Sequence, residues 1–180
     1  MVRALDLCFA LFGLIVLSPL LIIVLSVGWL DNRSPLFFQE RVGMNKKSFT
    51  LLKFRTMRPG TESVATHLVD KSAVTTFGQF MRNTKLDELP QLWNVLVGQM
   101  SLVGPRPSLC NQLKVIAARE KLGIYRVRPG ITGLAQIRGI DMSTPELLAK
   151  TDKEMLDSFD AYHYCRYILS TFIRTSNVNN

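Results

Sequence analysis

The chain has 180 residues, 47% of them hydrophobic, and a formal net charge of +8, which fits one domain with a core of its own. The three cysteines are far apart and lack metal-ligand spacing, which argues against a disulfide framework or a zinc site and favours buried thiols. Basic residues are spread along the chain without a nucleic-acid-binding motif, so nucleic acid is not an expected partner. Anionic lipids and phosphate substrates explain the charge better.

An apolar segment near the N-terminus, residues 7–30, contains no charged residue, and its length of about 24 positions is enough to cross a bilayer. It is too long for a secretory signal peptide and lacks a good cleavage site. Ser18 and Pro19 interrupt it at mid-length. Pro19 cannot donate an N–H to the carbonyl of Ile15, and its ring clashes with that carbonyl. We therefore expect a bend there, with the Ser18 hydroxyl returning a hydrogen bond to the freed backbone.

Positive charges flank this segment on both sides, with Arg3 before it and Arg33 and Lys46 among those that follow. The positive-inside rule therefore favours a cytoplasmic position for both ends. A re-entrant hairpin satisfies this rule, because each arm of about 12 residues rises about 18 Å, one leaflet of the bilayer. Asp6 and Asp31 would then bracket the hairpin at one interface. A kinked helix that crosses the membrane is the alternative.

The next part of the chain predicts a β-hairpin. Residues 36–42 and 48–55 have the composition of short strands and flank a turn that contains glycine and asparagine. Residues 58–76 are polar and predict a loop with some helix. Residues 77–82 place three apolar side chains on one helical face.

An acidic pair precedes the next predicted helix. Leucine and tryptophan side chains recur at helical spacing within residues 86–96, and Pro90 stands in the first turn, where proline is tolerated. Asp87 and Glu88 come immediately before this pattern. On residue types alone they are explained as a helix cap, because carboxylates suit the positive end of a helix.

The remaining sequence alternates rigid loops with helix. Residues 104–107 hold Arg106 between two prolines, which predicts an arginine presented from a stiff loop. Residues 128–136 form a second loop rich in proline and glycine. Residues 145–170 have a helical pattern that mixes apolar with basic side chains, as interfacial helices do. Residues 175–180 predict a disordered tail.

Six blocks of this sequence, in this order, resemble the small monotopic phosphoglycosyl transferases of bacteria, the bacterial sugar transferase family. They are Ser18-Pro19 in the apolar segment, FQERVG at 38–43, KFRTM at 53–57, LDELPQLWNVL at 86–96, MSLVGPRP at 100–107 and RPGITGLAQ at 128–136. The resemblance covers nearly the whole chain and is far more specific than an Asp-Glu pair alone. It favours the re-entrant hairpin over a crossing helix and a catalytic role over a cap.

The resemblance implies an enzyme that moves a sugar-1-phosphate from a UDP-sugar to undecaprenyl phosphate. Catalysis would use Mg²⁺ and a covalent phosphosugar intermediate, with release of UMP, as the first membrane step of bacterial glycoconjugate biosynthesis. Asp87 would be the nucleophile and Glu88 would help to hold the metal. Lys53, Arg82 and Arg106 match positions around the nucleotide and phosphates. Cations are needed because the charged pyrophosphate repels an attacking carboxylate.

The implied fold is mainly α with a small β-hairpin. Residues 1–31 would form the re-entrant membrane helix, and residues 32–174 a catalytic domain on the cytoplasmic face of the bacterial inner membrane. Interfacial amphipathic helices would contact membrane lipids. Residues 137–141 depart from the family, with Ile140 where an arginine is usual and Arg138 nearby, so no substrate contact is carried over to them. The motifs predict neither the sugar, the pathway nor the oligomeric state.

Two other functions are compatible with parts of the sequence. A non-catalytic membrane protein could keep the same fold, but the presence of both Asp87 and Glu88 favours an enzyme. A nucleic-acid binder would account for the basic charge, but not for the long apolar segment or the absence of a recognition motif.

Overall fold

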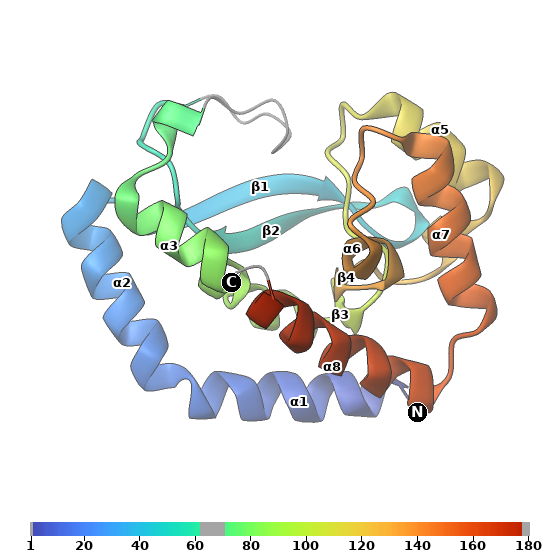
Figure 1. The fold of residues 1–180 in the computed structure, drawn as a ribbon, viewed down its shortest axis with the longest axis horizontal. Helices are drawn as coiled ribbons and strands as arrows, with labels where there is room; N and C mark the ends of the chain where they lie inside the picture. The colour runs from blue at the N-terminus through green and yellow to red at the C-terminus, as the bar shows by residue number, and fades with distance from the viewer. Residues whose placement is uncertain (1, 62–70, 178–180) are drawn as a thin grey trace.

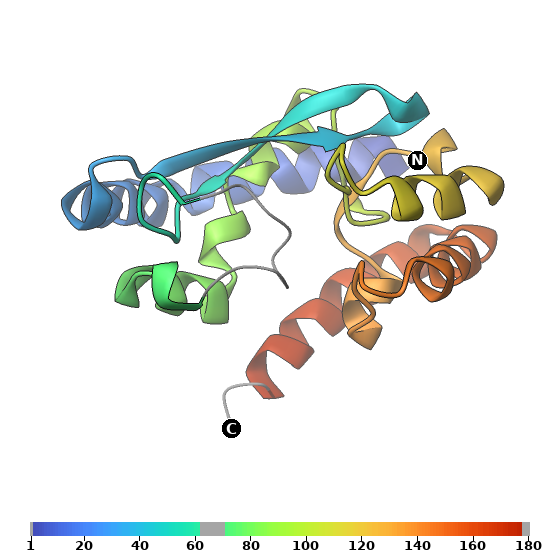
Figure 2. The same ribbon diagram turned by 90° about the horizontal axis from the view of Figure 1, so that it is seen from above.

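The computed structural model describes residues 2–61 and 71–177, and in this part of the chain helices predominate over two small two-stranded sheets (Figure 1). The mainly α fold expected from the sequence is therefore confirmed. From above, the β-hairpin and the N-terminal helices lie in one layer, and the later helices lie mainly below it (Figure 2).

The predicted hairpin is present, as strands β1 (Leu36–Val42) and β2 (Ser48–Phe54). The strands are antiparallel, with Leu36 opposite Phe54 and Val42 opposite Ser48. The intervening turn contains the short 3-10 helix η1 (Met44–Lys46), in which Asn45 has a φ of 55°. Asparagine tolerates this left-handed conformation better than most residues, which explains why the chain can reverse here.

The apolar N-terminal segment forms two helices, α1 (Val2–Val16) and α2 (Ser18–Asn32), bent by 62° at their junction. Ser18 Oγ donates a 2.7 Å hydrogen bond to the carbonyl of Ile15, as expected from the loss of the Pro19 N–H. In the described chain no single helix is both long and apolar enough to span a membrane, although the bent pair together meets that test of length and composition.

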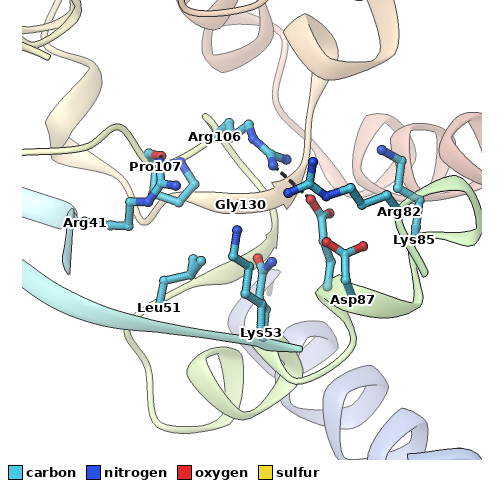
Figure 3. Close-up of a pocket in the computed structure, with 11 residues that line it drawn as sticks. Arg41, Leu51, Lys53, Arg82, Lys85, Asp87, Arg106, Pro107 and Gly130 are labelled. Carbon is cyan, nitrogen blue, oxygen red and sulfur yellow. Dashed lines mark hydrogen bonds and ion pairs between the residues drawn. The ribbon is translucent and has the colours of Figure 1, made fainter. Parts of the chain in front are cut away.

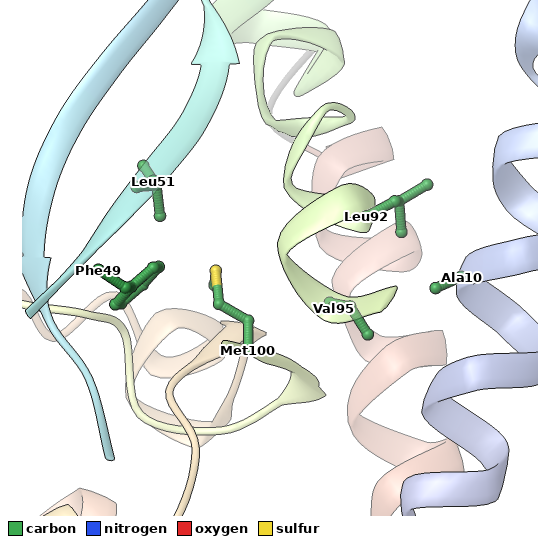
Figure 4. Close-up of a cluster of buried hydrophobic side chains, with 6 residues drawn as sticks. All are labelled: Ala10, Phe49, Leu51, Leu92, Val95 and Met100. Atoms are coloured by element: carbon green, nitrogen blue, oxygen red, sulfur yellow. The ribbon is translucent and has the colours of Figure 1, made fainter. Parts of the chain in front are cut away.

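The inner face of α1 belongs to the protein core. Its Ala10 is fully buried and contacts helix α4 (Gln91–Leu96), whose other side meets β2 (Figure 4). Asp6 also lies on this face and is 2% exposed. The position of Asp6 relative to a membrane interface stays a prediction, but its carboxylate accepts hydrogen bonds from distant segments inside the protein.

The outer face of the helix pair carries large apolar side chains that are exposed. They include Phe12, Ile15, Ile22, Ile23, Trp29 and Leu30. The end of α2 nevertheless stays on the globular part, since its Val24 packs with Phe54 and Met81 and its Asp31 accepts a hydrogen bond from Thr75 Oγ1. Both ends of the helix pair are thus attached to the same globular body.

The segment around the acidic pair differs from its prediction. Helix α3 (Thr76–Thr84) is capped by Thr75, after a short turn η3 (Lys71–Ala73), and is followed by a separate 3-10 turn η4 (Leu86–Glu88). Helix α4 begins only at Gln91, with Pro90 at its N-cap and no side-chain cap. Asp87 therefore does not cap this helix. The left-handed Lys85, with a φ of 60°, turns the chain before η4 and separates the acidic pair from α3.

A second sheet was not predicted. Strands β3 (Ser101–Val103) and β4 (Gly130–Thr132) pair in parallel, and helix α5 (Leu113–Lys121) and turn η5 (Ile124–Arg126) lie between them in sequence. Helix α6 (Leu134–Arg138) follows β4 directly.

The C-terminal helical pattern is divided into α7 (Pro145–Asp157) and α8 (Ala161–Asn177). The break follows Ser158, and Asp160 accepts a hydrogen bond from the His163 N–H at the start of α8. Helix α8 continues three residues into the segment expected to be disordered, whereas residues 178–180 lie outside the described chain, as do residues 62–70 of the loop expected at 58–76. All three cysteines are free and exposed, so the expected burial of the thiols is wrong.

Candidate active site

A polar cleft of about 160 Å³ lies between the hairpin, the η4 turn and the loop at 104–107 (Figure 3). All five residues that the sequence associates with catalysis or substrate binding line this cleft, although they are spread over more than fifty positions of the chain. The lining residues are Arg41, Leu51, Lys53, Arg82, Lys85, Asp87, Glu88, Gln91, Arg106, Pro107 and Gly130.

Asp87 is the buried carboxylate of the cleft, with 8% of its surface exposed. Within the described residues its carboxylate accepts no hydrogen bond from the protein. Burial, with the adjacent charge of Glu88, raises the pKa of Asp87 to about 6. A carboxylate held in this way is ionised near neutral pH but is poorly stabilised by the protein, which leaves it available to an incoming group.

Glu88 is in a different environment although it is the next residue. Its Oε1 lies 2.9 Å from Nη2 of Arg106, and its side chain is 16% exposed. Burial opposes ionisation of Glu88, but the charges of Arg106 and Lys85 outweigh it, so the pKa of Glu88 lies below its usual value. The two neighbouring carboxylates therefore differ in proton affinity, and Asp87 is the more basic of them.

Lys53 enters the cleft from β2, opposite Asp87, and its ammonium lies 5.2 Å from the ring centroid of Phe37 (Figure 3). Burial, followed by repulsion from Arg41, lowers the pKa of Lys53 to about 8. This ammonium group is thus poorly hydrated, and a bound anion would restore the stabilisation that it has lost.

Two more arginines are anchored at the edges of the cleft. Arg82 Nε donates to Thr56 Oγ1 at 2.8 Å, and Arg41 Nη1 donates to the carbonyl of Pro107 at 3.1 Å. Burial and the nearby charge of Arg106 lower the pKa of Arg41 to about 10. Five cationic side chains against two carboxylates make the cleft strongly positive, which suits a substrate with several phosphates.

The loop that presents Arg106 approaches β4 backbone to backbone. A Cβ on Gly130 would lie 2.0 Å from the backbone nitrogen of Gly104, so neither position has room for a side chain. The glycines of two motifs that are distant in sequence therefore allow the Arg106 loop to lie beside β4 and over the acidic pair.

Comparison with known proteins decides the family. The model of the family described as bacterial sugar transferase matches residues 1–177. The chain belongs to this family of transferase enzymes.

Individual relatives agree with this assignment. The chain is 38% identical over 161 residues to the uncharacterized sugar transferase EpsL of Bacillus subtilis (strain 168), covering 89% of this chain and 79% of that protein. It is 42% identical over 159 residues to the undecaprenyl-phosphate glucose phosphotransferase of Komagataeibacter xylinus, covering 83% of this chain and 29% of that protein. The UDP-glucose:undecaprenyl-phosphate glucose-1-phosphate transferase of Klebsiella pneumoniae is 38% identical over 148 residues, which cover 79% of this chain and 31% of that protein.

The chain spans only part of most of these relatives. After the Bacillus protein, the next four matched relatives are covered over 29% to 40% of their own length. The similarity to these longer sugar transferases therefore concerns one region of each.

Three polar cleft residues of this sugar transferase were not predicted as site residues: Arg41, Lys85 and Gln91. All of them lie within or beside the motifs that identified the family resemblance, so the sequence could have marked them as candidates. That their side chains point into the cleft depends on the fold of the hairpin and of η4. Gln91 is 5% exposed, and in the described chain no hydrogen bond to its amide is present. Arg138, by contrast, lines no part of the cleft and pairs with Glu154 on α7.

The donor set of the cleft fits one kind of metal site. Among the described residues there is no group of three or more His, Cys, Asp or Glu side chains that could hold an ion by themselves. Asp87 and Glu88 supply two carboxylates, and one oxygen of Glu88 is bound to Arg106. This arrangement matches Mg²⁺, which typically binds one or two carboxylates together with water and substrate phosphates.

Proposed function

We propose that this sugar transferase moves a sugar-1-phosphate from a UDP-sugar to undecaprenyl phosphate, and that Asp87 carries the sugar phosphate between the two substrates. The observation that carries the proposal is a buried carboxylate, without a hydrogen bond from the described protein, in a cleft with five cations. The names of the Komagataeibacter and Klebsiella relatives, which specify undecaprenyl phosphate, support the acceptor, and the Klebsiella name includes UDP-glucose as the donor.

In the first step, an oxygen of Asp87 attacks the phosphorus that bears the sugar. A bond forms between this oxygen and phosphorus, while the bond to the bridging oxygen breaks and its electron pair leaves with UMP. In the second step, a phosphate oxygen of undecaprenyl phosphate attacks the same phosphorus and Asp87 leaves as a carboxylate. The product is undecaprenyl diphosphate-sugar, and no proton needs to be added to Asp87 at any stage.

The cations of the cleft make the first step possible. A diphosphate and a carboxylate repel each other, so the attack requires positive charge around the phosphates. Lys53 faces Asp87 across the cleft, and its lowered pKa means that a neighbouring anion would stabilise its charged form. Arg106 and Arg82 would bind the phosphates or the nucleotide, and their planar guanidinium groups suit bidentate contact with phosphate oxygens.

Mg²⁺, held by Glu88 and Asp87 together with substrate phosphates, would neutralise charge that develops on the diphosphate. Glu88 has the lower pKa of the two carboxylates and therefore remains ionised over a wider pH range. Its ion pair with Arg106 also links the acidic pair to the arginine loop, so both sides of the phosphate site would be fixed relative to each other.

The acceptor is a lipid, and we propose that α1 and α2 form a re-entrant membrane anchor that keeps the cleft on the cytoplasmic face of the inner membrane. Exposed apolar side chains on both helices, the 62° bend and the attachment of both helix ends to the same globular body support this topology. Such an anchor would hold the active site at the level of the lipid phosphate, where this transfer would begin bacterial glycoconjugate synthesis.

Intact-protein mass spectrometry tests the proposal. The enzyme is incubated with Mg²⁺ and a UDP-sugar, without the lipid acceptor, and UMP is measured in parallel. We expect up to one equivalent of UMP and an added mass equal to the sugar phosphate on the peptide that contains Asp87. A preparation that turns over with acceptor but never carries this mass would contradict the covalent step. A panel of UDP-sugars in the same assay would identify the donor.

A further inference from the structure

The loop at residues 104–108 is held in an unusual way. Its two prolines have no N–H group, so the loop is fixed largely through its carbonyl oxygens. Four successive carbonyls accept hydrogen bonds. They are Pro105 O from Gly130 N at 2.9 Å, Arg106 O from Arg119 Nη1 at 2.7 Å, Pro107 O from Arg41 Nη1 at 3.1 Å and Ser108 O from Val42 N at 3.0 Å.

One of these donors differs from the others. Three come from β1 or β4, which border the cleft, but Arg119 comes from α5 and is 1% exposed. Its Nε and Nη2 lie 2.9 Å and 2.7 Å from Oδ2 of Asp152 on α7, which is also 1% exposed. Arg119 therefore connects a buried ion pair between two helices to the backbone carbonyl of Arg106.

Stability alone is a weak explanation for this ion pair. Two buried charges lose their hydration, and well-packed apolar side chains of similar volume stabilise a protein as well or better. The pair is also incompletely satisfied, because Oδ1 of Asp152 is buried without a hydrogen bond among the described residues. Arginine has a property that such replacements lack, since its planar guanidinium can bind a carboxylate along one side and donate to a carbonyl from another.

The side chain of Arg106 needs such support. It is 45% exposed, and in the described chain its one ion-pair partner is Glu88. A long, half-exposed side chain loses much conformational freedom when it is held in place, so an unfixed backbone beneath it would spread the guanidinium over many positions. A displacement of about 1 Å can reduce the rate of a positioned reaction considerably.

We infer that Arg119, oriented by Asp152, is a positioning residue that fixes the backbone of Arg106 so that its guanidinium meets Glu88 and the phosphates of the substrate. This inference rests on the proposed function for its effect on the reaction. It extends the active site through α5 to α7, by contacts that do not touch the substrate.

The double variant Arg119→Met/Asp152→Leu separates positioning from folding. It removes both buried charges together, so we expect its thermal stability to remain close to that of wild type. Its kcat, measured with a UDP-sugar that wild type turns over, should fall about 10-fold. In an Arg106→Ala background the same two substitutions should change kcat by less than about twofold, because their effect passes through Arg106. A role in overall structure would instead reduce activity by a similar factor in both backgrounds.

Two further variants keep the test decisive. Arg119→Lys retains the charge beside Asp152 but cannot reach both partners in one fixed geometry, so it should reproduce the loss if the double variant fails to fold. Arg138→Met/Glu154→Leu removes an exposed ion pair between α6 and α7 and should leave kcat unchanged.

Hydrogen exchange provides a readout that does not depend on turnover. Peptides covering residues 104–112 should exchange faster in Arg119→Met/Asp152→Leu than in wild type, while the peptides of the hairpin should not change. A folded double variant with wild-type kcat and unchanged exchange in this loop would overturn the inference. If wild type released no UMP from any UDP-sugar, the proposed function would fail, whereas the exchange measurement would still decide whether Arg119 fixes the loop.

Discussion

Two buried aspartates of this protein, one under α1 and one in the cleft, have opposite environments. Asp6 is 2% exposed, and its Oδ1 accepts three hydrogen bonds of 2.9 Å, from Ser101 Oγ, Leu102 N and Tyr164 OH. Asp87 is 8% exposed and accepts none from the described residues. A leucine precedes each of them in the sequence, and the difference in their hydrogen bonding arises from the fold.

The comparison separates a structural carboxylate from a reactive one. Neutral donors on β3 and α8 stabilise the Asp6 carboxylate and saturate its Oδ1, which joins α1 to the rest of the protein. The charge of Asp87 is instead opposed by burial and by Glu88, and the compensating cations lie across an open cleft. Burial of a carboxylate is therefore informative about catalysis only when its hydrogen-bond partners are counted as well.

Substitution of each aspartate by asparagine gives the largest contrast. Asp87→Asn keeps the size of the side chain but removes the attacking anion, so kcat should fall by at least about 10³-fold. Asp6→Asn leaves the cleft intact, and its folded fraction should retain kcat within about threefold of wild type. The kcat of each variant is measured by UMP release, after its folded fraction has been determined by circular dichroism. An Asp87→Asn enzyme with a tenth of wild-type kcat would refute the distinction.

Arg106→Ala tests the cationic side of the cleft. Loss of a charged hydrogen bond to the phosphates should raise the transition-state free energy by about 1–3 kcal/mol, which lowers kcat/KM about 5-fold to 150-fold. Arg138→Ala is the control, because that arginine pairs with Glu154 on the surface and does not line the cleft. Equal kcat/KM values for Arg106→Ala and wild type would show that Arg106 does not stabilise the phosphates in the transition state.

The sequence predicted the parts of this site that depend on local pattern. The hairpin followed from two short strands about a turn, and Lys53 could be placed on its second strand. The acidic pair and Arg106 were identified by motif, and the bend at Ser18 by the chemistry of proline. Each of these depends on a few neighbouring residues, which is why a single sequence was sufficient.

The features that were missed depend on contacts between distant segments. Strands β3 and β4 have three residues each, too few for a recognisable pattern, and they pair across more than twenty intervening positions. The burial of Asp6 could not be predicted, because its donors Ser101 and Tyr164 are about 95 and 158 residues away in the sequence. The separation of η4 from α4 arose from Pro90, which the helical pattern alone could not exclude from the helix.

The pH dependence should report the environment of Asp87 directly. Asp87 must be ionised to attack, so kcat/KM should fall about 10-fold per pH unit below about 6, its pKa in the free enzyme. Lys53 must be protonated to neutralise phosphate, so activity should also fall above about 8. The profile is measured at low substrate concentration. In Lys53→Met the alkaline limb near 8 should disappear from the residual activity, and its persistence would exclude Lys53 as its cause.

The two substitutions Asp87→Asn and Asp6→Asn should change the free energy of unfolding in opposite directions. Asp87 has a higher pKa in the folded protein, about 6, than the ordinary value of 3.8, so its contribution to stability is full below pH 3.8 and is lost as the pH rises through 6. At pH 7.5 Asp87→Asn should therefore raise the free energy of unfolding by about 1–3 kcal/mol, with no gain near pH 4. Asp6→Asn should lower it by about 1–3 kcal/mol at pH 7.5, because charged hydrogen bonds are weakened. Urea unfolding at both pH values measures these differences. Destabilisation by Asp87→Asn at pH 7.5 would mean that its charge is compensated in the folded protein.

The smallest effect is expected at the bend between α1 and α2. Ser18→Ala/Pro19→Ala restores a backbone N–H at position 19 and removes the hydroxyl bond to Ile15, so a continuous helix becomes more favourable. Asp6 and Asp31 oppose this change, because each attaches one end of the helix pair to the globular body. We therefore expect only a minor fraction of the double variant to cross the membrane, and a larger fraction when Asp6→Asn is added. A single cysteine placed before Arg3, in a background without the native cysteines, reports the topology through its accessibility to a membrane-impermeant reagent. Wild-type protein labelled at this position only from the periplasm would disprove the re-entrant arrangement, and an unchanged fraction in the triple variant would show that Asp6 does not hold the end of α1 in place.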